Sequence, residues 1–443
     1  MIYRLYRLVA ALGWPMAWLV LQVRVARGKE DPRRLAERFG RTREARPTGR
    51  LFWFHGASVG ESLSLLPLIR ALLERDPALN ILVTTGTVTS AEILKARLPA
   101  RAQHRFVPVD CPQAVARFLD HWRPDLGVWV ESEFWPNLIL GAERRAIPLA
   151  LINARLSARS ARRWRRAGFA FRALLGRFDK IFAQSEEALA RLTRLGAGPA
   201  RHLGNLKYAA DPLPVKEALV HDSAARLRDR PVWMAASTHP GEEEIVAAAH
   251  REIAKDHPAL LTVLAPRHPN RGDSVARLLE RRGLNFARRS RGEMPTQETD
   301  IWLIDTIGEL GTFFRLAPVV LVGGSLVPHG GHNLLEPAQF GAAILTGPHM
   351  ENFTEIMARL RDADAVRPVR ADDLAASVSA LLRAPEEREA LARRARAAAA
   401  AERKIVDLLV EELLELDKAR RSASDVAGTE ASAKNREAGD ARA

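Results

Sequence analysis

A carboxylate that could act as a general base follows the first strongly apolar run of the chain. In FHGASVGE, an expected strand ends at His55, a Gly/Ser turn follows, and Glu61 lies at the start of an expected helix. A carboxylate at such a strand end can accept the proton of an attacking hydroxyl group. Ser58 and Glu61 also have the spacing of a capping box, in which the glutamate only satisfies backbone N–H groups. The residues alone leave both roles open.

A second group of polar residues occupies the segment VESEFWPNLI. Glu131 and Glu133 alternate along the end of an expected strand, and Trp135 stands directly before a helix start. Two carboxylates beside a large aromatic ring favour a sugar or cation site, whereas a solvated strand terminus would have the same composition. Lys207, in the motif GNLKYA, stands at the junction of the two halves of the chain, where it could reach the cleft between them.

Arginines dominate the segment 153–172. Six of them lie between residues 155 and 166, together with Trp164. Guanidinium groups bind phosphates in a bidentate manner, so this run predicts a phosphate site. A solvated helix face is the alternative. The candidate phosphate ligands are Arg155, Arg159, Arg162 and Arg163.

Four motifs in the second half share one pattern: an expected strand, a small or polar turn, and a helix start. Helix N-termini present unpaired N–H groups and a positive dipole end, which suit a nucleotide phosphate. Asn333 and Glu336 also have capping spacing, so a structural role stays open. The glycines match neither a Walker A loop nor the G-x-G-x-x-G fingerprint. The motifs are STHPGEEE (237–244), APRHPNR (265–271), DTIGEL (305–310) and GGSLVPHGGHNLLEPAQFG (323–341).

The sequence predicts no metal site. Asp362 and Asp364 form a D-x-D pattern, but they follow a helical segment and are typical of a turn. No histidine or cysteine cluster has zinc spacing.

The length and the charge of the chain limit the class of protein to which it can belong. The chain has 443 residues, enough for two domains of about 200 residues each, and its single cysteine, Cys111, forms no internal disulfide. The net charge is +14. Residues 1–50 and 155–177 each contribute +8, so the remainder is nearly neutral. Two local basic patches fit a phosphate-bearing membrane or lipid, and we predict no nucleic-acid partner.

The N-terminal segment predicts membrane association. Sixteen uncharged residues lie between Arg7 and Arg24. As a helix they cover roughly 24 Å, less than the ~30 Å hydrocarbon core, so they could span it with snorkelling arginines or lie in the interface. The arginines that follow place the bulk of the protein in the cytoplasm by the positive-inside rule. A buried core helix and a cleaved signal peptide are the alternatives.

The rest of the chain alternates short β-rich runs with amphipathic helical segments, which predicts parallel sheets built from βαβ units. We therefore expect two doubly wound Rossmann-like domains facing a cleft, where ligands bind. The predicted strands are 51–55, 81–85, 126–131, 148–153, 180–184, 232–236, 260–265, 301–305 and 319–324. The predicted organisation is an anchor over 1–28, a first domain over 29–210, a linker over 211–231, a second domain with closing helices over 232–420, and a disordered tail over 421–443.

Taken together, these motifs resemble the bacterial 3-deoxy-D-manno-octulosonic acid (Kdo) transferases of lipopolysaccharide synthesis. The likeness runs from about residue 1 to 415, and the set of motifs in order is specific where each alone is weak. It rests on ASVGE (57–61), ESEFWPNLI (131–139), NARLSARS (153–160), GNLKY (204–208), STHPGEEE (237–244), PRHP (266–269), GEL (308–310) and GGSLVPHGGHNLLEPA (323–338).

The resemblance implies a GT-B fold and a metal-independent, inverting transfer of Kdo from CMP-Kdo to the lipid A precursor lipid IVA, with no cofactor, at the cytoplasmic face of a bacterial inner membrane. It implies that the first domain binds the acceptor and the second binds the CMP-sugar. It makes Glu61 the base and assigns transition-state stabilisation to Glu131 and Lys207. The implied CMP-binding residues are Arg267, His268, Ile307, Gly308, Glu309, Leu310, Asn333, Leu334, Leu335 and Glu336.

Two other functions remain as alternatives. One is a GT-B enzyme that uses a UDP-sugar. The other is a non-catalytic peripheral membrane protein that binds acidic lipids through its arginines. Comparing the thermal shifts caused by CMP and by UDP would distinguish the first alternative from a Kdo transferase. Lipid binding without CMP release would identify the second.

Overall fold

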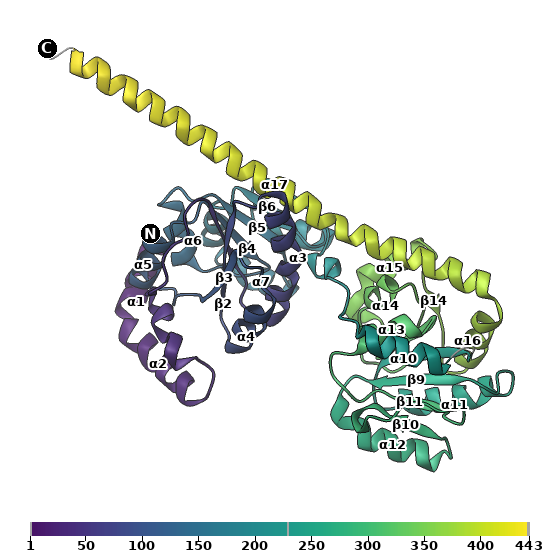
Figure 1. Ribbon diagram of the computed structural model, residues 1–443. Coiled ribbons are helices and arrows are strands. Elements are labelled where there is room, and N and C mark those ends of the chain that lie inside the picture. Colours follow the sequence, from purple (N-terminus) through teal and green to yellow (C-terminus); the bar gives the residue numbers. More distant parts are fainter. Residues whose placement is uncertain (1, 228–229, 441–443) are drawn as a thin grey trace. The chain divides into compact units, whose positions relative to one another are not determined.

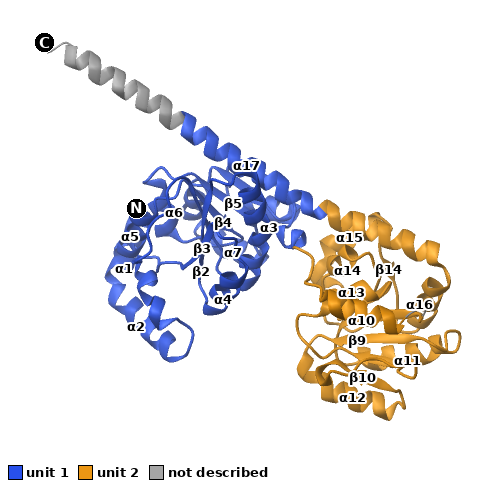
Figure 2. Cartoon of the chain, in the orientation of Figure 1, with its two compact units in different colours: residues 1–210, 402–443 blue, residues 211–401 orange. Residues whose placement is uncertain are grey.

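The computed structural model describes residues 2–227 and 230–440. The chain forms two compact units (Figure 2): unit 1 contains the residues up to 210 and from 402 onward, and unit 2 contains residues 211–401. The boundary at 210 coincides with the predicted end of the first domain. The segment expected to be a linker contains instead the helix α10 (Glu217–Leu227), which packs in unit 2 against α13 (Leu310–Leu316).

Unit 1 is built on a seven-stranded sheet in the order β3-β2-β1-β4-β5-β6-β7, with all neighbouring strands parallel. This confirms the expected doubly wound α/β class. The strands are β1 (Leu51–His55), β2 (Asn80–Thr85), β3 (Ala102–Phe106), β4 (Leu126–Val130), β5 (Leu149–Ala154), β6 (Lys180–Ala183) and β7 (Ala200–His202). The helices and 3-10 turns after the N-terminal pair are η1 (Pro32–Phe39), α3 (Val59–Arg75), α4 (Val88–Arg97), α5 (Pro112–Trp122), α6 (Pro136–Glu143), α7 (Ala158–Arg166), α8 (Gly168–Leu175), α9 (Glu186–Arg194) and η2 (Leu206–Ala209).

The central strands of unit 1 are apolar on both faces because both faces are covered. Along β1, Trp53 enters the core on one face of the sheet, whereas Phe52 and Phe54 enter the core on the other. The second core also receives an apolar stripe of the long helix α17 (Pro385–Asp440), which runs beside α3 (Figure 1). Thus the part of the closing helices from residue 402 belongs to unit 1, whereas the sequence assigned it to the second domain. The stripe consists of Ile405, Val406, Leu409, Val410, Leu413 and Leu416.

Unit 2 repeats the architecture with the strand order β10-β11-β9-β8-β12-β13-β14, again parallel throughout. Its strands are β8 (Val232–Thr238), β9 (Leu261–Pro266), β10 (Phe286–Arg288), β11 (Ile301–Leu303), β12 (Val319–Val322), β13 (Ala343–Thr346) and β14 (Arg367–Pro368). Its remaining helices and turns are α11 (Glu242–Ala254), η3 (Pro269–Arg271), α12 (Gly272–Arg281), η4 (Arg289–Arg291), α14 (Leu335–Gln339), η5 (Glu351–Phe353), α15 (Thr354–Asp362) and α16 (Leu374–Arg383).

Each sheet has one point where the strand order reverses, between β1 and β4 in unit 1 and between β8 and β12 in unit 2. In open α/β sheets, ligands bind outside the carboxyl ends of the strands at such a point, because the loops on either side diverge there. The candidate residues of the first half follow β1 and β4. Three of the four motifs of the second half follow β8, β9 and β12. The topology therefore gathers them at two edges.

The N-terminal segment forms two helices, α1 (Ile2–Leu12) and α2 (Trp14–Ala26), bent by 58° at their junction. No single helix in the described part of the chain is long and apolar enough to cross a bilayer, although this bent pair passes the test together. Most of its large apolar side chains are exposed, so a buried core helix is wrong for this segment. The exposed side chains are Ile2, Leu5, Tyr6, Leu8, Val9, Leu12, Met16, Trp18, Leu19, Val20 and Val23.

The disorder expected over 421–443 stays a prediction. The backbone continues as α17 to Asp440, while residues 441–443 lie outside the described chain. Ala, Glu, Lys and Arg, which are frequent in this segment, all have high helix propensity.

Candidate functional site

Glu61 lies in the first turn of α3, directly after β1, and is only 8% exposed. Its carboxylate accepts a hydrogen bond from the Ala57 backbone N–H at 2.7 Å and another from the Ser58 hydroxyl at 2.7 Å. The Ser58 oxygen in turn accepts the Glu61 N–H at 3.3 Å. The predicted capping geometry is therefore present. It fixes the carboxylate at the strand end, where a base would have to be held.

Glu131 follows β4, the neighbour of β1, in the left-handed backbone region at φ 58°. It is 8% exposed, and its carboxylate forms an ion pair with the ammonium group of Lys207. Lys207 comes from η2, whose start is fixed by two amide side chains. The Oδ1 atom of Asn205 accepts the Lys207 N–H at 3.1 Å, and that of Asn153 accepts the Leu206 N–H at 2.9 Å. The structure thus brings two of the three predicted catalytic residues into contact.

Glu133 lies two residues further on, opposite the buried ring of His55. The Glu133 carboxylate lies 3.7 Å from His55 Nε2 and accepts the Trp135 indole N–H at 2.7 Å. Burial alone would raise the pKa of Glu133, but the interactions with His55 and Trp135 outweigh burial and lower it. Glu133 is therefore an anion at neutral pH and anchors the loop that carries Glu131.

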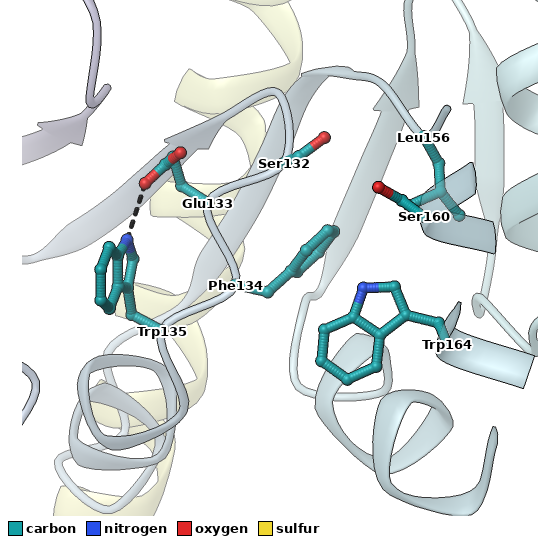
Figure 3. A pocket seen from close by; sticks show the side chains of 7 residues that line it. All are labelled: Ser132, Glu133, Phe134, Trp135, Leu156, Ser160 and Trp164. Carbon is teal, nitrogen blue, oxygen red and sulfur yellow. Dashed lines mark hydrogen bonds between the residues drawn. The ribbon is translucent and has the colours of Figure 1, made fainter. Parts of the chain in front are cut away.

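A pocket of about 230 Å³ opens between this loop and the start of α7 (Figure 3). Phe134 and Trp164 both pack on the ring of Phe171, with centroid distances of 4.9 Å and 4.3 Å. Aromatic faces beside hydroxyl groups are a surface suited to a sugar or an apolar chain. The lining residues are Ser132, Glu133, Phe134, Trp135, Leu156, Ser160 and Trp164.

The predicted phosphate ligands lie at and beyond the start of α7, which is capped by Ser157. All four guanidinium-bearing residues are exposed, and no carboxylate in the described ranges forms an ion pair with them. Unpaired arginines are available to an external anion. They are Arg155, Arg159, Arg162 and Arg163.

In unit 2 the two central loops are tied together by one buried carboxylate. Glu242, at the start of α11, accepts four backbone N–H groups, from His239 at 2.9 Å, Gly324 at 2.7 Å, Ser325 at 3.0 Å and Leu326 at 2.9 Å. This carboxylate joins the loop after β8 to the loop after β12, so the two sides of the reversal point are held rigidly.

A cluster of histidines, which we call the histidine cluster, lies on these loops: His239, His268, His329 and His332. The Nε2 atoms of His239 and His332 are 2.8 Å apart. The ring of His239 lies 3.6 Å from that of His329 and 6.0 Å from that of His268. Sequence reasoning named only His268. The other three stand in quoted motifs, but their contact depends on β8 and β12 being adjacent, which no local pattern gives.

The residues expected to bind the nucleotide fall into two classes. Arg267 and His268 follow β9 and are exposed, and the Ile307 side chain is 86% exposed. Gly308 lies between Ile307 and α13 and has φ 80°. Leu334 and Leu335, by contrast, are fully buried, so they can present only backbone groups to a ligand.

Two acidic members of the predicted nucleotide site have partners inside unit 2. Glu309 pairs with Lys216 and Arg289 at 2.9 Å each and accepts the Thr306 hydroxyl. Burial would raise the pKa of Glu309, but the hydrogen bonds from these three groups lower it to about 2. Glu336 is different: burial raises its pKa, against a hydrogen bond from Asn333 at 3.2 Å. Leu310, which begins α13, is half-buried.

Among the side chains that the structure describes, which end at residue 422, no group of three or more His, Cys, Asp or Glu is arranged to hold a metal ion. Asp362 ends α15 and Asp364 has φ 49°, which is the turn that the sequence predicted.

Comparison with known proteins gives consistent matches. Residues 33–210 match the family model described as "3-Deoxy-D-manno-octulosonic-acid transferase (kdotransferase)". A 3-deoxy-D-manno-octulosonic acid transferase of Haemophilus influenzae is 40% identical over 368 residues, covering 81% of this chain and 85% of that protein. A probable mitochondrial one of Arabidopsis thaliana is 36% identical over 397 residues, covering 87% and 89%.

A solved structure shares the fold. The UDP-GlcNAc 2-epimerase of Neisseria meningitidis, bound to UDP-GlcNAc, superposes with a TM-score of 0.55 at 16% identity, covering 83% of this chain and 100% of that one. At this identity the likeness shows the fold alone. The fold is GT-B-like, as expected.

Proposed function

Because the chain belongs to the Kdo transferase family of glycosyltransferases, we propose that it moves Kdo from CMP-Kdo to lipid IVA with inversion at the anomeric carbon. The observation that carries this proposal is the placement of Glu61 and the Glu131–Lys207 ion pair after the neighbouring strands β1 and β4. A base and a fixed cation beside it are what an attacking hydroxyl group needs.

In the proposed reaction, an acceptor hydroxyl oxygen forms a bond to the anomeric carbon of Kdo while the bond from that carbon to the CMP phosphate oxygen breaks. The hydroxyl proton passes to the Glu61 carboxylate. Glu61 suits this role because two hydrogen bonds, from Ala57 and Ser58, hold its carboxylate in place. The Ser58 hydroxyl group carries one rotatable proton, so it can turn toward another acceptor when the carboxylate becomes protonated.

We propose that the ammonium group of Lys207 stabilises the transition state. Glu131 holds Lys207 in position through the ion pair and is itself fixed by the turn at φ 58°. A positive charge pre-positioned where negative charge develops needs no reorganisation during the reaction, which is the main source of electrostatic catalysis. Lys207 would act on the acceptor oxygen as charge shifts toward the phosphate.

We place the CMP moiety at the carboxyl edge of unit 2, beside Arg267 and His268 and the turn of residues 307–310. The exposure of Arg267 supports this, because its guanidinium can receive the charge that the departing phosphate gains. The described residues offer no metal-ligand cluster that would do the same. We therefore propose a metal-independent enzyme without a cofactor.

We place the acceptor in unit 1. The unpaired arginines of 155–163 suit its phosphates, and the aromatic pocket beside them suits its sugar or the start of an acyl chain. The exposed apolar surface of α1 and α2 would hold the protein at the cytoplasmic face of a bacterial inner membrane.

The test is product analysis. Purified full-length protein is incubated with CMP-Kdo and lipid IVA, and the lipid is analysed by mass spectrometry. We expect a mass increase of one or more Kdo units with matching CMP release. Transfer only from a UDP-sugar would replace the donor assignment, and lipid binding without any CMP release would leave a non-catalytic lipid-binding protein.

A further inference from the structure

The histidine cluster has an unusual charge environment. His239 is 5% exposed, and its Nε2 atom shares a hydrogen bond with that of His332. Such a bond exists between two neutral rings only if one donates its proton and the other accepts it. The exposed His329 packs against His239, with 3.6 Å between the ring centroids and the rings tilted by 32°. His239 and His332 therefore share one proton between their Nε2 atoms, and the cluster is open to solvent on the side of His329.

The charged groups around the cluster are mostly cationic. Arg267 and Arg271, on the segment after β9, face it together with His268. The nearby carboxylates are engaged elsewhere. On α11, Glu242 accepts four backbone N–H groups and Glu243 pairs with Arg271.

The remaining segments packed against the cluster add no free negative charge. On α14, Glu336 is half-buried and accepts a hydrogen bond from Asn333. On the segment next to Gly330 and Gly331, His349 and Glu351 interact with each other at 3.4 Å. Burial first, and then the neighbouring histidines and arginines, lower the pKa of His239 and of His332 to about 4. Without a ligand, both rings are therefore neutral at pH 7.

The backbone at Gly324 keeps this arrangement open. A Cβ atom there would lie 3.2 Å from the ring of His332 and 3.4 Å from that of His239, and the residue has φ 65°. Glycine has no Cβ atom, so it allows this close approach and adopts the positive φ without strain.

We propose that His239, His329 and His332 form the subsite for the carboxylate of the transferred sugar acid, and that the cluster takes up a proton when this carboxylate binds. The inference rests on the proposed donor and deepens it. An anion next to the rings offsets the burial and the repulsion that keep them neutral, so an imidazolium becomes stable and donates from both of its ring nitrogens. The donor phosphate, by comparison, has the guanidinium group of Arg267.

The consequence is donor specificity. A neutral sugar nucleotide would leave the cluster without its counter-ion, so it would gain nothing from these three residues. A sugar acid would gain a charge-assisted hydrogen bond and would draw in a proton. The subsite thus distinguishes a nucleotide that carries an acidic sugar from one that carries a hexose.

The experiment is isothermal titration calorimetry of the full-length protein with CMP-Kdo and, separately, with CMP, in two buffers of different ionisation enthalpy at pH 6. A neighbouring carboxylate raises the pKa of these rings from about 4 to between about 5 and 7, so we expect uptake of part of a proton with CMP-Kdo and none with CMP, by linkage of binding to protonation. His332→Gln should abolish the uptake and weaken CMP-Kdo on the order of 10-fold, while CMP affinity is unchanged. His221→Gln, an exposed histidine on α10, is the matched control and should behave as the unchanged protein.

Several outcomes overturn the assignment. These are no proton uptake with CMP-Kdo, an equal loss of affinity for CMP and CMP-Kdo, or no effect in His332→Gln. If His332→Gln no longer binds CMP because unit 2 is unfolded, the exposed His329→Gln takes its place with the same expected pattern. Binding of a UDP-sugar, with neither CMP nor CMP-Kdo bound by the unchanged protein, would instead refute the proposed donor.

Discussion

The ammonium group of Lys207 lies against the carboxylate of Glu131, so a short turn after β7 and the end of β4 share one ion pair. Each residue has the structural support expected of a fixed pair: Glu131 is held by the turn at φ 58°, and Lys207 by the Asn205 side chain. The pair joins segments that are distant in sequence at the edge where β1 and β4 end.

Lys207→Met should lower turnover by on the order of 10²-fold or more, because the transition state loses a pre-positioned cation and Glu131 loses its counter-ion. The effect should fall mainly on kcat rather than on KM. Lys180→Met is the matched control, since Lys180 pairs with Glu412 far from the site. Steady-state kinetics of both variants check this, and equal effects on turnover would contradict the catalytic role of Lys207.

Glu61→Gln should reduce turnover by on the order of 10²–10⁴-fold with the fold intact. Glutamine can still accept the Ala57 N–H and retain most of the capping, so stability should fall by at most ~1 kcal/mol. CMP affinity should persist, because the proposed nucleotide residues belong to unit 2.

A separate variant calibrates the cost of a lost cap. Ser185→Ala removes the cap of α9, where the Ser185 oxygen accepts the Ala188 N–H at 3.1 Å. It should cost about 1 kcal/mol and leave turnover unchanged. A folded Glu61→Gln enzyme that matches Ser185→Ala in turnover would show that Glu61 is only a cap.

Deletion of residues 1–28 should release the protein from membranes while both sheets remain folded. The deletion removes the exposed apolar surface of α1 and α2, but it leaves the Arg38–Glu30 ion pair that anchors the following segment. Vesicle flotation and circular dichroism measure the two effects. Complete co-flotation of the shortened protein would mean that the arginines of 155–163 dominate membrane binding instead.

Glu309 should make the stability of unit 2 pH-dependent. Its pKa is lowered to about 2 in the folded protein from an ordinary value of 4.5. The unfolded chain therefore binds the proton more readily, so the stabilisation is present above pH 4.5 and is lost as the pH falls toward 2. Glu309→Gln should lower the urea midpoint at pH 7, and the difference from the unchanged protein should shrink below pH 4. A constant difference across this range would contradict the assignment.

Turnover should survive excess EDTA. We propose that Arg267 and Lys207, rather than a metal ion, balance the charge of the reaction. Loss of Kdo transfer on chelation, with recovery on adding Mg²⁺, would be evidence against this arrangement.

The central strands could be predicted from sequence because they are continuous apolar runs bounded by turns. The runs around Trp53, Trp129 and Met234 all became strands. Five strands, β7, β10, β13, β14 and β3, were missed, and β3 has the sequence AQHRF. It lies at the edge of its sheet, is only partly buried, and lacks an apolar run. Strands of this kind are stabilised by their neighbours more than by their composition.

The site was predictable where one motif holds the chemistry. Glu61 comes one turn after the predicted strand 51–55, and Glu131 is the last residue of the predicted strand 126–131, so their placement at the sheet edge followed from the local pattern. The contact between His239 and His332 could not be predicted, because it depends on the order of strands in the sheet. Likewise, nothing local indicates that residues 405–416 cover the sheet of unit 1.

The contribution of α17 to unit 1 has a consequence for biosynthesis. The residues that complete one face of the first sheet, Ile405 to Leu416, are translated after the whole of unit 2. While the ribosome is still making unit 2, the nascent first sheet lacks this cover and exposes apolar surface of the kind that chaperones bind. We therefore expect unit 2 to be able to mature without waiting for the chain terminus, whereas unit 1, although made first, becomes complete last.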